Sequence, residues 1–382
     1  MSELLAQLRE SRDAVERRLP SWWRRGVIVG AVAVAIVLPF LFDPASGFMN
    51  ATVISLAYVV MALGLNIVVG FAGLLDLGYV AFFALGAYTI GWFASSFFSK
   101  ADVHVLASHV ANTQPGIHLN FVLVLVAAVI ITSIAGTIIG LPTLRLRGDY
   151  IAIVTLAFGE IIGVLAVNGD SISIFGEPLT RGNQGITPVD PVQLPFVSPF
   201  NQLNLRPWYW TILAILALVL FVNVRLRDSR LGRAWVALRE DEVAAVSMGI
   251  PLVRTKLLAY ATGAAFGGMS GAFLGAFYNE VNASQFQFSF SIFVLAMVIV
   301  GGLGSIWGVL LGAILLSYIN YYLIPDVFKG VPHSFGLNFD LTDLSFGIFG
   351  FLLVLVMVLR PQGLFPERRR TIELTGADEA GS

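Results

Sequence analysis

The stretch MNATVISLAYVVMALGLNIVVG, residues 49–70, contains no Asp, Glu, Lys, Arg or His. An α-helix needs about 20 consecutive apolar residues to cross the hydrocarbon core of a bilayer. The apolar positions here run continuously and do not alternate with polar ones, as they would in a membrane β-strand. The stretch therefore predicts a helix that spans a membrane.

Similar runs recur along the chain and predict an all-α polytopic membrane protein with about ten transmembrane helices. A bundle of helices satisfies every backbone hydrogen bond in lipid within its own segments. The run 290–302 is short, so it and the run that follows could form one element that is broken around 302–305. The ten runs cover residues 26–42, 49–70, 79–98, 119–141, 150–167, 208–224, 257–277, 290–302, 305–323 and 343–359.

The composition indicates the same class. Hydrophobic residues make up 57% of the chain and charged residues 12%, with a mean hydropathy of +0.82, whereas about 25% of a soluble domain is charged. The net charge of −1 does not favour a nucleic-acid partner. The chain has no Cys, and its four His all fall in connecting segments, so we expect neither disulfides nor a metal site.

The Lys and Arg residues predict the orientation, because they concentrate on the cytoplasmic side of a membrane. With ten spans and the N-terminus inside, 19 of the 23 Lys and Arg residues fall on the inner side and four on the outer side. One missed span would invert every later segment. This bias therefore predicts ten spans with N- and C-termini cytoplasmic.

These spans divide the chain into three parts. We expect an amphipathic cytoplasmic segment at 1–25, a transmembrane domain at 26–360 and a cytoplasmic tail at 361–382. The two substantial extracytoplasmic loops are 99–118 and 168–207, and the second is rich in Pro, Gly, Asn and Asp. Loops of this length are often functional, so they are either plain connections or a docking rim for an external partner.

Glycines recur every fourth residue in two of the spans. This spacing places them on one helix face, where a neighbouring helix can approach closely. Tight packing is the expected role, and a moving gate is the alternative. The helix-packing candidates are Gly263, Gly267, Gly271, Gly275, Gly304, Gly308 and Gly312.

Glycine clusters at 69–78 and 299–308 resemble breaks within helices, because they carry almost no charge. In transporters such breaks often mark the substrate path, although a tight cytoplasmic turn fits equally well. Polar side chains in the spans could line that path, or they could be structural. A charge at the bilayer centre costs at least about 2.5–3.5 kcal/mol, so it should face the bundle interior. The pathway candidates are Asn66, Asp76, Tyr88, Thr155 and Glu160.

One long, densely charged segment separates two spans: RLRDSRLGRAWVALREDEVAAVSMGIPLVRTK, residues 225–256. The part 230–248 lacks Pro and predicts one short amphipathic helix. Gly249 should cap its C-terminus, and Pro251 prevents its continuation. On these facts the segment is either a basic loop held by anionic lipid or a contact helix for a cytosolic protein.

Glu242-Val-Ala-Ala245, followed by Gly249, resembles the E-A-A…G coupling loop of ABC importer permeases, with Val243 in place of the usual Ala. Other segments resemble permeases of branched-chain amino acid importers, of the LivM type rather than the shorter LivH type. The resemblance covers most of residues 50–366. The matching segments are NIVVGFAGLLDLG (66–78), ALGAY (84–88), LRLRGDYIAIVTLAFGE (144–160), GGLGSIWG (301–308) and RPQGLF (360–365).

The resemblance implies a non-catalytic subunit of an importer for branched-chain or related amino acids in a bacterial cytoplasmic (inner) membrane. Its implied partners are a LivH-type permease, two cytosolic ATP-binding subunits and an extracytoplasmic amino-acid-binding protein. ATP and Mg²⁺ would bind to the partner ATPases, and this chain contains no G-x-x-x-x-G-K-[ST] phosphate loop. The implied ATPase-coupling residues are Arg233, Arg239, Glu240, Glu242, Ala244, Ala245 and Gly249.

Three other classes compete with this interpretation. An ion-driven secondary transporter would use carboxylates within the membrane, and Asp76 and Glu160 are candidates for that role. A channel would need a selectivity filter, and no segment resembles one. A membrane enzyme would need a cluster of nucleophile, acid and metal groups, which the chain does not contain.

Overall fold

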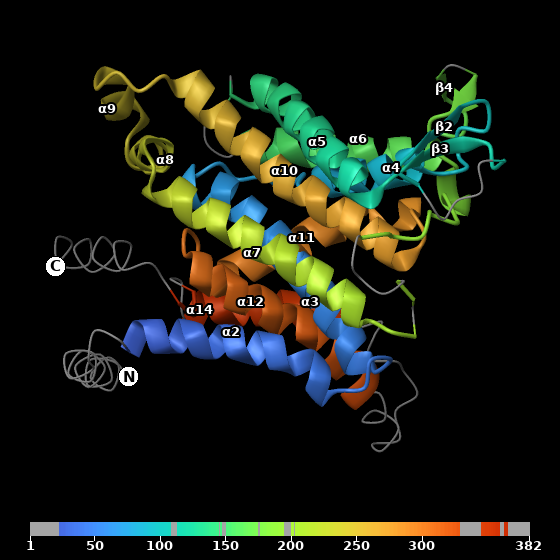
Figure 1. Cartoon of the computed structure of the whole chain (residues 1–382). Helices are drawn as coiled ribbons and strands as arrows, with labels where there is room; N and C mark the ends of the chain where they lie inside the picture. Colours follow the sequence, from blue (N-terminus) through green and yellow to red (C-terminus); the bar gives the residue numbers. More distant parts are fainter. Residues whose placement is uncertain are drawn as a thin grey trace.

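The computed structural model describes residues 23–107, 113–144, 146, 150–174, 176–194, 200–201, 203–328, 345–359 and 363–365. Most of the expected N-terminal segment 1–25 and of the tail 361–382 therefore lies outside the described residues. The described chain forms a bundle of helices with small β-sheets at one end and the helices α8 and α9 at the other (Figure 1).

The long apolar runs all form helices. The helices are α2 (Trp23–Leu41), α3 (Gly47–Leu65), α4 (Val80–Phe93), α5 (Phe121–Thr143), α6 (Tyr150–Asn168), α7 (Arg206–Asp228), α8 (Arg230–Glu240), α9 (Glu242–Ser247), α10 (Leu252–Tyr278), α11 (Phe288–Gly301), α12 (Ile306–Tyr318) and α14 (Ser345–Leu359). The π-helices η1 (Asn66–Phe71) and η4 (Ile319–Val327) extend α3 and α12, and the 3₁₀ turns are η2 (Gly182–Gln184) and η3 (Ala283–Gln285).

The class predicted from the sequence is confirmed: this is an all-α, multi-pass membrane protein. In the part of the chain that the structure describes, seven helices are long and apolar enough to cross a membrane. The three other expected spans coincide with α2, α4 and α14. Ten crossings and the cytoplasmic location of both termini stay predictions.

The ends of several helices differ from the expected spans; α7 ends at Asp228 rather than 224, and α10 begins at Leu252 rather than 257. The third run was expected to reach residue 98, but α4 ends at Phe93 because Ala94–Ser95 forms strand β1. The ninth run was expected to end at 323, but it continues as the π-helix η4 to Val327. Pro325 lies within η4, where its missing N–H breaks the regular helix ladder.

Helix α10 is the central packing element, and it contacts α3, α4 and α5 along its length. Gly263 lies against the carbonyl of Gly64 in α3, and Gly271 lies against the backbone of α4 at Phe83. On the side facing α5, Gly268 lies against Thr132. Glycine at these positions allows α10 to approach its three neighbours closely.

Helix α5 shows how the sequence separates the protein interior from the lipid. Its buried positions include Ala128, Thr132, Gly136 and Gly140, which are four residues apart and face α10. A second stripe at the same spacing, on another face, is apolar and exposed: Val122, Val126, Ile130, Ile134 and Ile138. We assign the exposed stripe to lipid, because small residues favour helix contact and bulky apolar ones favour hydrocarbon.

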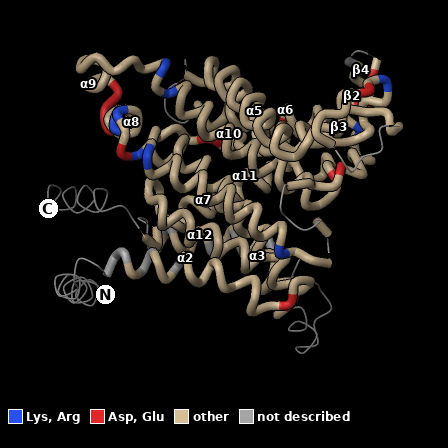
Figure 2. Tube along the Cα trace, viewed as in Figure 1, with Lys and Arg blue, Asp and Glu red and all other residues tan. Residues whose placement is uncertain are grey.

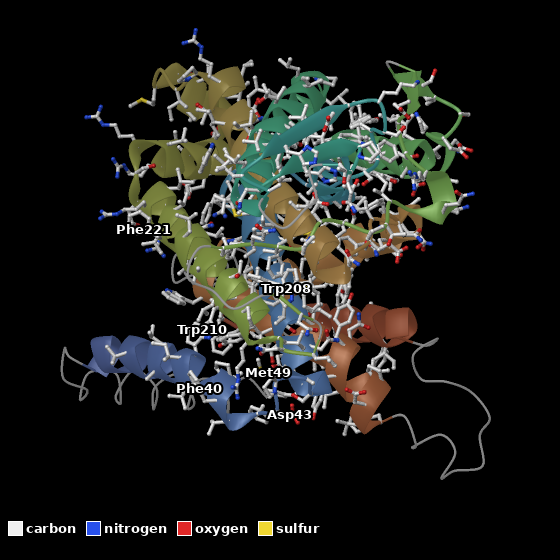
Figure 3. The ribbon with its side chains drawn as sticks, turned by 45° about the vertical axis from the view of Figure 1, so that its right-hand side comes forward. Phe40, Asp43, Met49, Trp208, Trp210 and Phe221 are labelled. Atoms are coloured by element: carbon white, nitrogen blue, oxygen red, sulfur yellow. The ribbon has the colours of Figure 1, made fainter. Side chains whose placement is uncertain are left out.

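Helix α2 contacts the bundle near its C-terminal end (Figure 3). Arg206 Nε in α7 donates to the carbonyl of Pro39 at 3.0 Å, and the Tyr209 hydroxyl donates to that of Ala35 at 2.6 Å. The rings of Phe40 and Trp210 lie 6.3 Å apart at the same contact. Pro39 has no N–H to donate to the carbonyl of Ala35, four residues earlier, which explains why the Tyr209 hydroxyl can bind that carbonyl. The carbonyl of Pro39 itself lies in the last turn of α2, where helix carbonyls have no partner within the helix.

The expected loops 99–118 and 168–207 carry more structure than plain connections. Strand β3 (Gly116–Leu119) pairs antiparallel with β1 (Ala94–Ser95) and parallel with β2 (Asp102–Val105). In the second loop, β4 (Ser173–Ile174) and β5 (Glu177–Pro178) form a hairpin. The β1–β3 pairing links the first loop to the end of α4, and a bridge between Ile186 and Val281 links the second loop to the segment after α10. Whether they form a docking rim stays a prediction.

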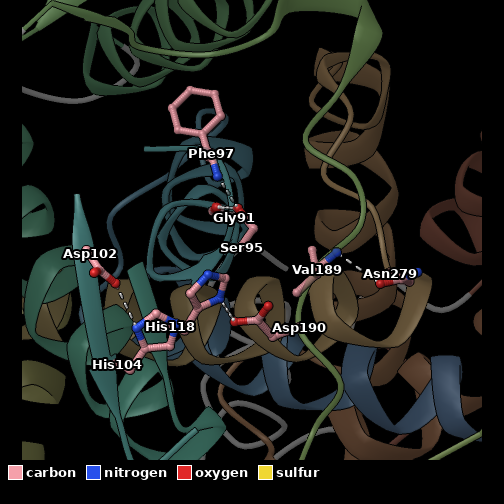
Figure 4. A network of polar contacts seen from close by, with 9 residues as sticks. All are labelled: Gly91, Ser95, Phe97, Asp102, His104, His118, Val189, Asp190 and Asn279. Atoms are coloured by element: carbon pink, nitrogen blue, oxygen red, sulfur yellow. Dashed lines mark hydrogen bonds and ion pairs between the residues drawn. The ribbon is translucent and has the colours of Figure 1, made fainter. Parts of the chain in front are cut away.

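A partly buried polar network holds these loops together (Figure 4). His118 Nδ1 lies 2.8 Å from Asp190 Oδ2, and His104 Nδ1 lies 3.1 Å from Asp102 Oδ1. The two imidazole rings stack with their centroids 4.8 Å apart. Burial raises the pKa of the Asp190 carboxyl, and its hydrogen bond with His118 opposes that rise. These histidines therefore link the two loops.

Replacing Gly271 with Ala should destabilise the bundle, because the added Cβ would collide with the Phe83 carbonyl oxygen. Overpacking of this kind costs about 1–3 kcal/mol. Gly30→Ala in α2 is the matched control, because a Cβ there meets nothing within 4 Å. We expect a lower thermal midpoint in detergent for Gly271→Ala alone. Equal midpoints would contradict the packing described for α10.

Candidate functional site

Lys and Arg gather at the end of the bundle where α7 continues into α8 (Figure 2). Helices α8 and α9 project from this end, between the spans α7 and α10. Trp235 anchors α8, since its side chain is fully buried and its Nε1 donates to the Thr255 carbonyl at 2.7 Å. The charged segment is therefore a folded element held against the membrane domain.

The single helix expected over 230–248 is wrong, because the chain breaks at Asp241. This residue has an extended backbone (φ −149°, ψ 107°) between α8 and α9. Its Oδ1 accepts from the N–H groups of Val243 and Ala244, both at 2.9 Å. Asp241 therefore acts as the N-cap of α9, a role that Asp favours over the helix interior.

The cap predicted at Gly249 is present. Gly249 has φ +88°, its N–H donates to Val246 at 2.9 Å, and the next N–H, of Ile250, donates to Ala245 at 3.1 Å. This pair of hydrogen bonds is the Schellman motif, which favours glycine because the left-handed conformation suits a residue without Cβ.

The charged residues that were predicted to couple to an ATPase mainly bind partners within the segment 225–256. Glu242 Oε2 lies 2.6 Å from Nζ of Lys256, whose side chain is only 8% exposed, so Glu242 neutralises a lysine that is nearly buried. Arg233 donates to the Asp228 carbonyl at 2.9 Å. Ala245 is buried, whereas Glu240 and Ala244 are exposed.

The outer surface of α9 is apolar and exposed. Val243 is 76% exposed, Val246 is 46% exposed and Met248 is 84% exposed. We call these three residues the α9 surface. Exposed apolar groups beside a dense set of charges are typical of a protein contact site. Sequence reasoning did not identify these three residues as an exposed group, because it predicted one amphipathic helix over 230–248 without the break at Asp241.

Arg239 joins this element to a break in the membrane domain. Its guanidinium donates to the carbonyl of Gly70, in the π-helix η1. The stem of the same side chain packs over Gly73, which has φ +68° and has no room for a Cβ. The end of α8 is therefore fixed to the end of the α3–η1 helix.

The first break is in turn linked to the second. Asn66 is fully buried, and its Oδ1 accepts from the N–H of Gly304 at 2.9 Å. Gly304, with φ +84°, precedes α12, so it serves the turn after α11 rather than a helix face. The residues beyond α14 close the same region, where the Leu364 N–H donates to the Val300 carbonyl at 2.9 Å.

The other pathway candidates do not share one site. Asp76 is buried, and its Oδ1 accepts from the Gly78 N–H at 2.9 Å. Thr155 Oγ1 accepts from Leu77 in the same break at 3.0 Å. Tyr88 stacks on Trp92 with ring centroids 5.7 Å apart. Asp76 and Thr155 therefore bind backbone N–H groups, and Tyr88 contributes to aromatic packing.

The expectation that Glu160 faces the bundle interior is wrong for this chain. Glu160 is exposed at the middle of α6. The opposite side of α6 is occupied by contact with the α3–α4 break, because Gly159 lies against Gly78. The carboxylate therefore belongs to the outer surface of the bundle.

Sequence reasoning also missed a cavity of about 260 Å³ between α3, α4, α10, α11 and η4, which has both aromatic and polar lining residues. Its polar lining includes Tyr58, Tyr278, Asn320 and Tyr321. The signal in the sequence was a tyrosine or asparagine within an apolar run. Many such residues only contribute to packing, so the sequence alone did not distinguish these four from the others.

Comparison with known proteins adds the family. The model of the family "Branched-chain amino acid transport system / permease component" matches residues 47–357. The LivM permease protein of Salmonella typhimurium strain LT2 is 34% identical over 93% of this chain and 78% of its own length. LivM of Escherichia coli K12 is 35% identical over the same shares.

LivH-type relatives match only part of this chain. The LivH permease protein of the same Salmonella strain is 30% identical over 169 residues, which are 44% of this chain and 49% of LivH. No solved structure matches. Because the family model covers most of the chain, this protein belongs to the family of branched-chain amino acid transport permeases.

Proposed function

We propose that this chain is the membrane-spanning, non-catalytic permease subunit of an ABC importer for branched-chain or related amino acids in a bacterial inner membrane. It forms half of the translocation pathway, and a second, LivH-type permease forms the other half. Two cytosolic subunits hydrolyse ATP with Mg²⁺, and an extracytoplasmic binding protein delivers the amino acid. The family match supports the transport role.

The observation that carries the coupling role is the folded pair α8–α9. It lies at the end rich in Lys and Arg, where the positive-inside bias predicts cytoplasm. Its inner side is fixed by Trp235 and by the Glu242–Lys256 pair, while the α9 surface is left uncovered. An element that is rigid inside and apolar outside suits docking against a cytosolic ATPase.

The contacts behind α8 supply a route into the bundle. A displacement of α8 would act on η1 through Arg239, and η1 contacts the second break through Asn66. ATP binding can switch the pathway between outward and inward access only if it favours one state of the bundle over the other. We propose that the ATPases set the position of α8 and that the two breaks change conformation with it.

The exposure of Glu160 supports the proposal that a second permease contacts this chain. A charge at the bilayer centre costs at least about 2.5–3.5 kcal/mol if it faces lipid. Its neighbours Ile153 and Val164, also exposed, would suit either lipid or protein. We propose that this face of α6 packs on the partner permease, which supplies a hydrogen-bond donor to the carboxylate.

An ion-driven secondary transporter is the alternative. It needs ionisable groups that share a path. In the described structure Asp76 is buried in a break, whereas Glu160 is on the outer surface, and this separation favours the importer.

Met248→Asp should abolish co-purification of the ATP-binding subunits, because it places a charge on the exposed apolar α9 surface. Leu203→Asp is the matched control, since Leu203 is 75% exposed but precedes α7, at its other end. The measurement is affinity purification in mild detergent with mass spectrometry and an ATPase assay. Retention of the subunits by Met248→Asp would exclude the α9 surface as the contact.

Arg239→Leu should keep the ATP-binding subunits bound but reduce amino acid uptake. Loss of a hydrogen bond from a charged donor costs about 1.5–3 kcal/mol, so we expect uptake to fall at least about tenfold. Arg230→Leu, on the exposed side of α8, serves as the control. Unchanged uptake at equal membrane abundance would show that the Arg239–Gly70 contact does not transmit the motion.

Glu160→Leu should release the second permease during purification, because it removes the acceptor from the α6 face. Glu160→Gln keeps a hydrogen-bonding side chain and should retain the partner. Ile153→Leu controls for packing on the same face. If Glu160→Leu assembles and transports as the wild type does, this face does not contact the partner through its carboxylate.

A further inference from the structure

The cavity noted above lies at the end of α10 that is opposite to α9. Helix α10 begins at Leu252, close to α9, and ends at Tyr278, which lines the cavity. Its 27 residues, at about 1.5 Å each, span about 40 Å. This distance exceeds the hydrocarbon thickness of about 30 Å, so the mouth of the cavity lies on the opposite side of the membrane from α9.

The inner part of the cavity is aromatic. Tyr58, at mid-length in α3, packs against Phe290 at 5.5 Å, Phe293 at 5.7 Å and Tyr321 at 5.4 Å between ring centroids. The hydroxyls of Tyr58 and Tyr321 share a hydrogen bond. Phe83 stacks on Phe290 at 4.6 Å. These rings form an apolar wall that is rigid because each ring is fixed by another.

The outer part is polar and uncharged. Ser284, Gln285, Gln287 and Ser289 contribute from the segment that joins α10 to α11, and Asn320 contributes from η4. Among the described residues that line the cavity, none carries a formal charge. Amide and hydroxyl groups can both donate and accept, so this rim can bind a carboxylate and an ammonium of the same molecule.

The size of the cavity suits a small solute. A volume of about 260 Å³ is far above the space for one water molecule. It is just below the pockets of about 300–1,000 Å³ that hold drug-sized ligands. Its amide and hydroxyl groups can form hydrogen bonds with water or with a polar ligand.

We propose that this cavity is an amino-acid-binding site on the outer side of the pathway. The aromatic wall receives the apolar side chain, and the amide and hydroxyl rim holds the zwitterionic main-chain groups. The inference rests on the proposed function and adds the residues that would select for side-chain size. The absence of charge in the lining suits a carrier site, because weak binding allows release toward the cytoplasm.

The test uses the complete complex in proteoliposomes, with both permeases, the ATP-binding subunits and the binding protein. Uptake of radiolabelled leucine and phenylalanine is measured for Phe290→Ala, which enlarges the aromatic part. We expect the ratio of the two KM values to shift toward phenylalanine by about tenfold, the usual effect of a changed apolar pocket. A residue with a purely structural role would lower both rates and leave this ratio unchanged.

A second variant blocks the rim. Ser289→Trp should abolish leucine uptake in complexes that still contain all subunits, whereas Ile134→Trp, on the exposed apolar stripe of α5 and outside the cavity, should not. If Phe290→Ala leaves the ratio unchanged, or if Ser289→Trp transports leucine normally, the cavity is not the site and the importer role stands. If the wild-type complex shows no ATP-dependent uptake, the proposed function fails, and the site with it.

Discussion

Backbone contact along α10 is the constraint on which the bundle depends. Helices in lipid gain no hydrophobic free energy by associating, so close van der Waals packing must hold them together. Gly263, Gly268 and Gly271 bring α10 against α3, α5 and α4 in turn. A helix packed this closely on three sides moves with its neighbours, because packed interiors resist continuous deformation. We propose that a displacement near α9 is thereby carried toward the cavity at the other end.

At the two helix breaks, backbone groups lose their regular helix partners and are hydrogen-bonded by side chains instead. Gly70 has its carbonyl bound by Arg239, and Gly304 has its N–H bound by Asn66. Both partners are side chains, so either hydrogen bond can be exchanged without unfolding a helix. We therefore propose that the breaks are the parts of the bundle that change conformation; the first contacts α8 through Arg239, and the second contacts the first through Asn66.

The sequence was sufficient to locate the helices, because length and apolar character alone decide what can span a bilayer. It also predicted the cap at Gly249, which depends on local backbone conformation. It failed at Asp241, because the choice between helix interior and N-cap depends on how α8 packs through Trp235. It failed at Glu160 for a similar reason: a lone polar residue in a run shows depth in the membrane but not which face is buried.

The position of Glu160 also bears on what this chain can be by itself. The nearly buried Lys256 is neutralised by Glu242, and the buried Asp76 is hydrogen-bonded within its break. Glu160 instead faces outward at the middle of a span. A carboxylate there is unfavourable in lipid, so we propose that a second protein covers this face of the bundle. In the proposed importer this protein is the partner permease, which supplies a hydrogen-bond donor to the carboxylate of Glu160.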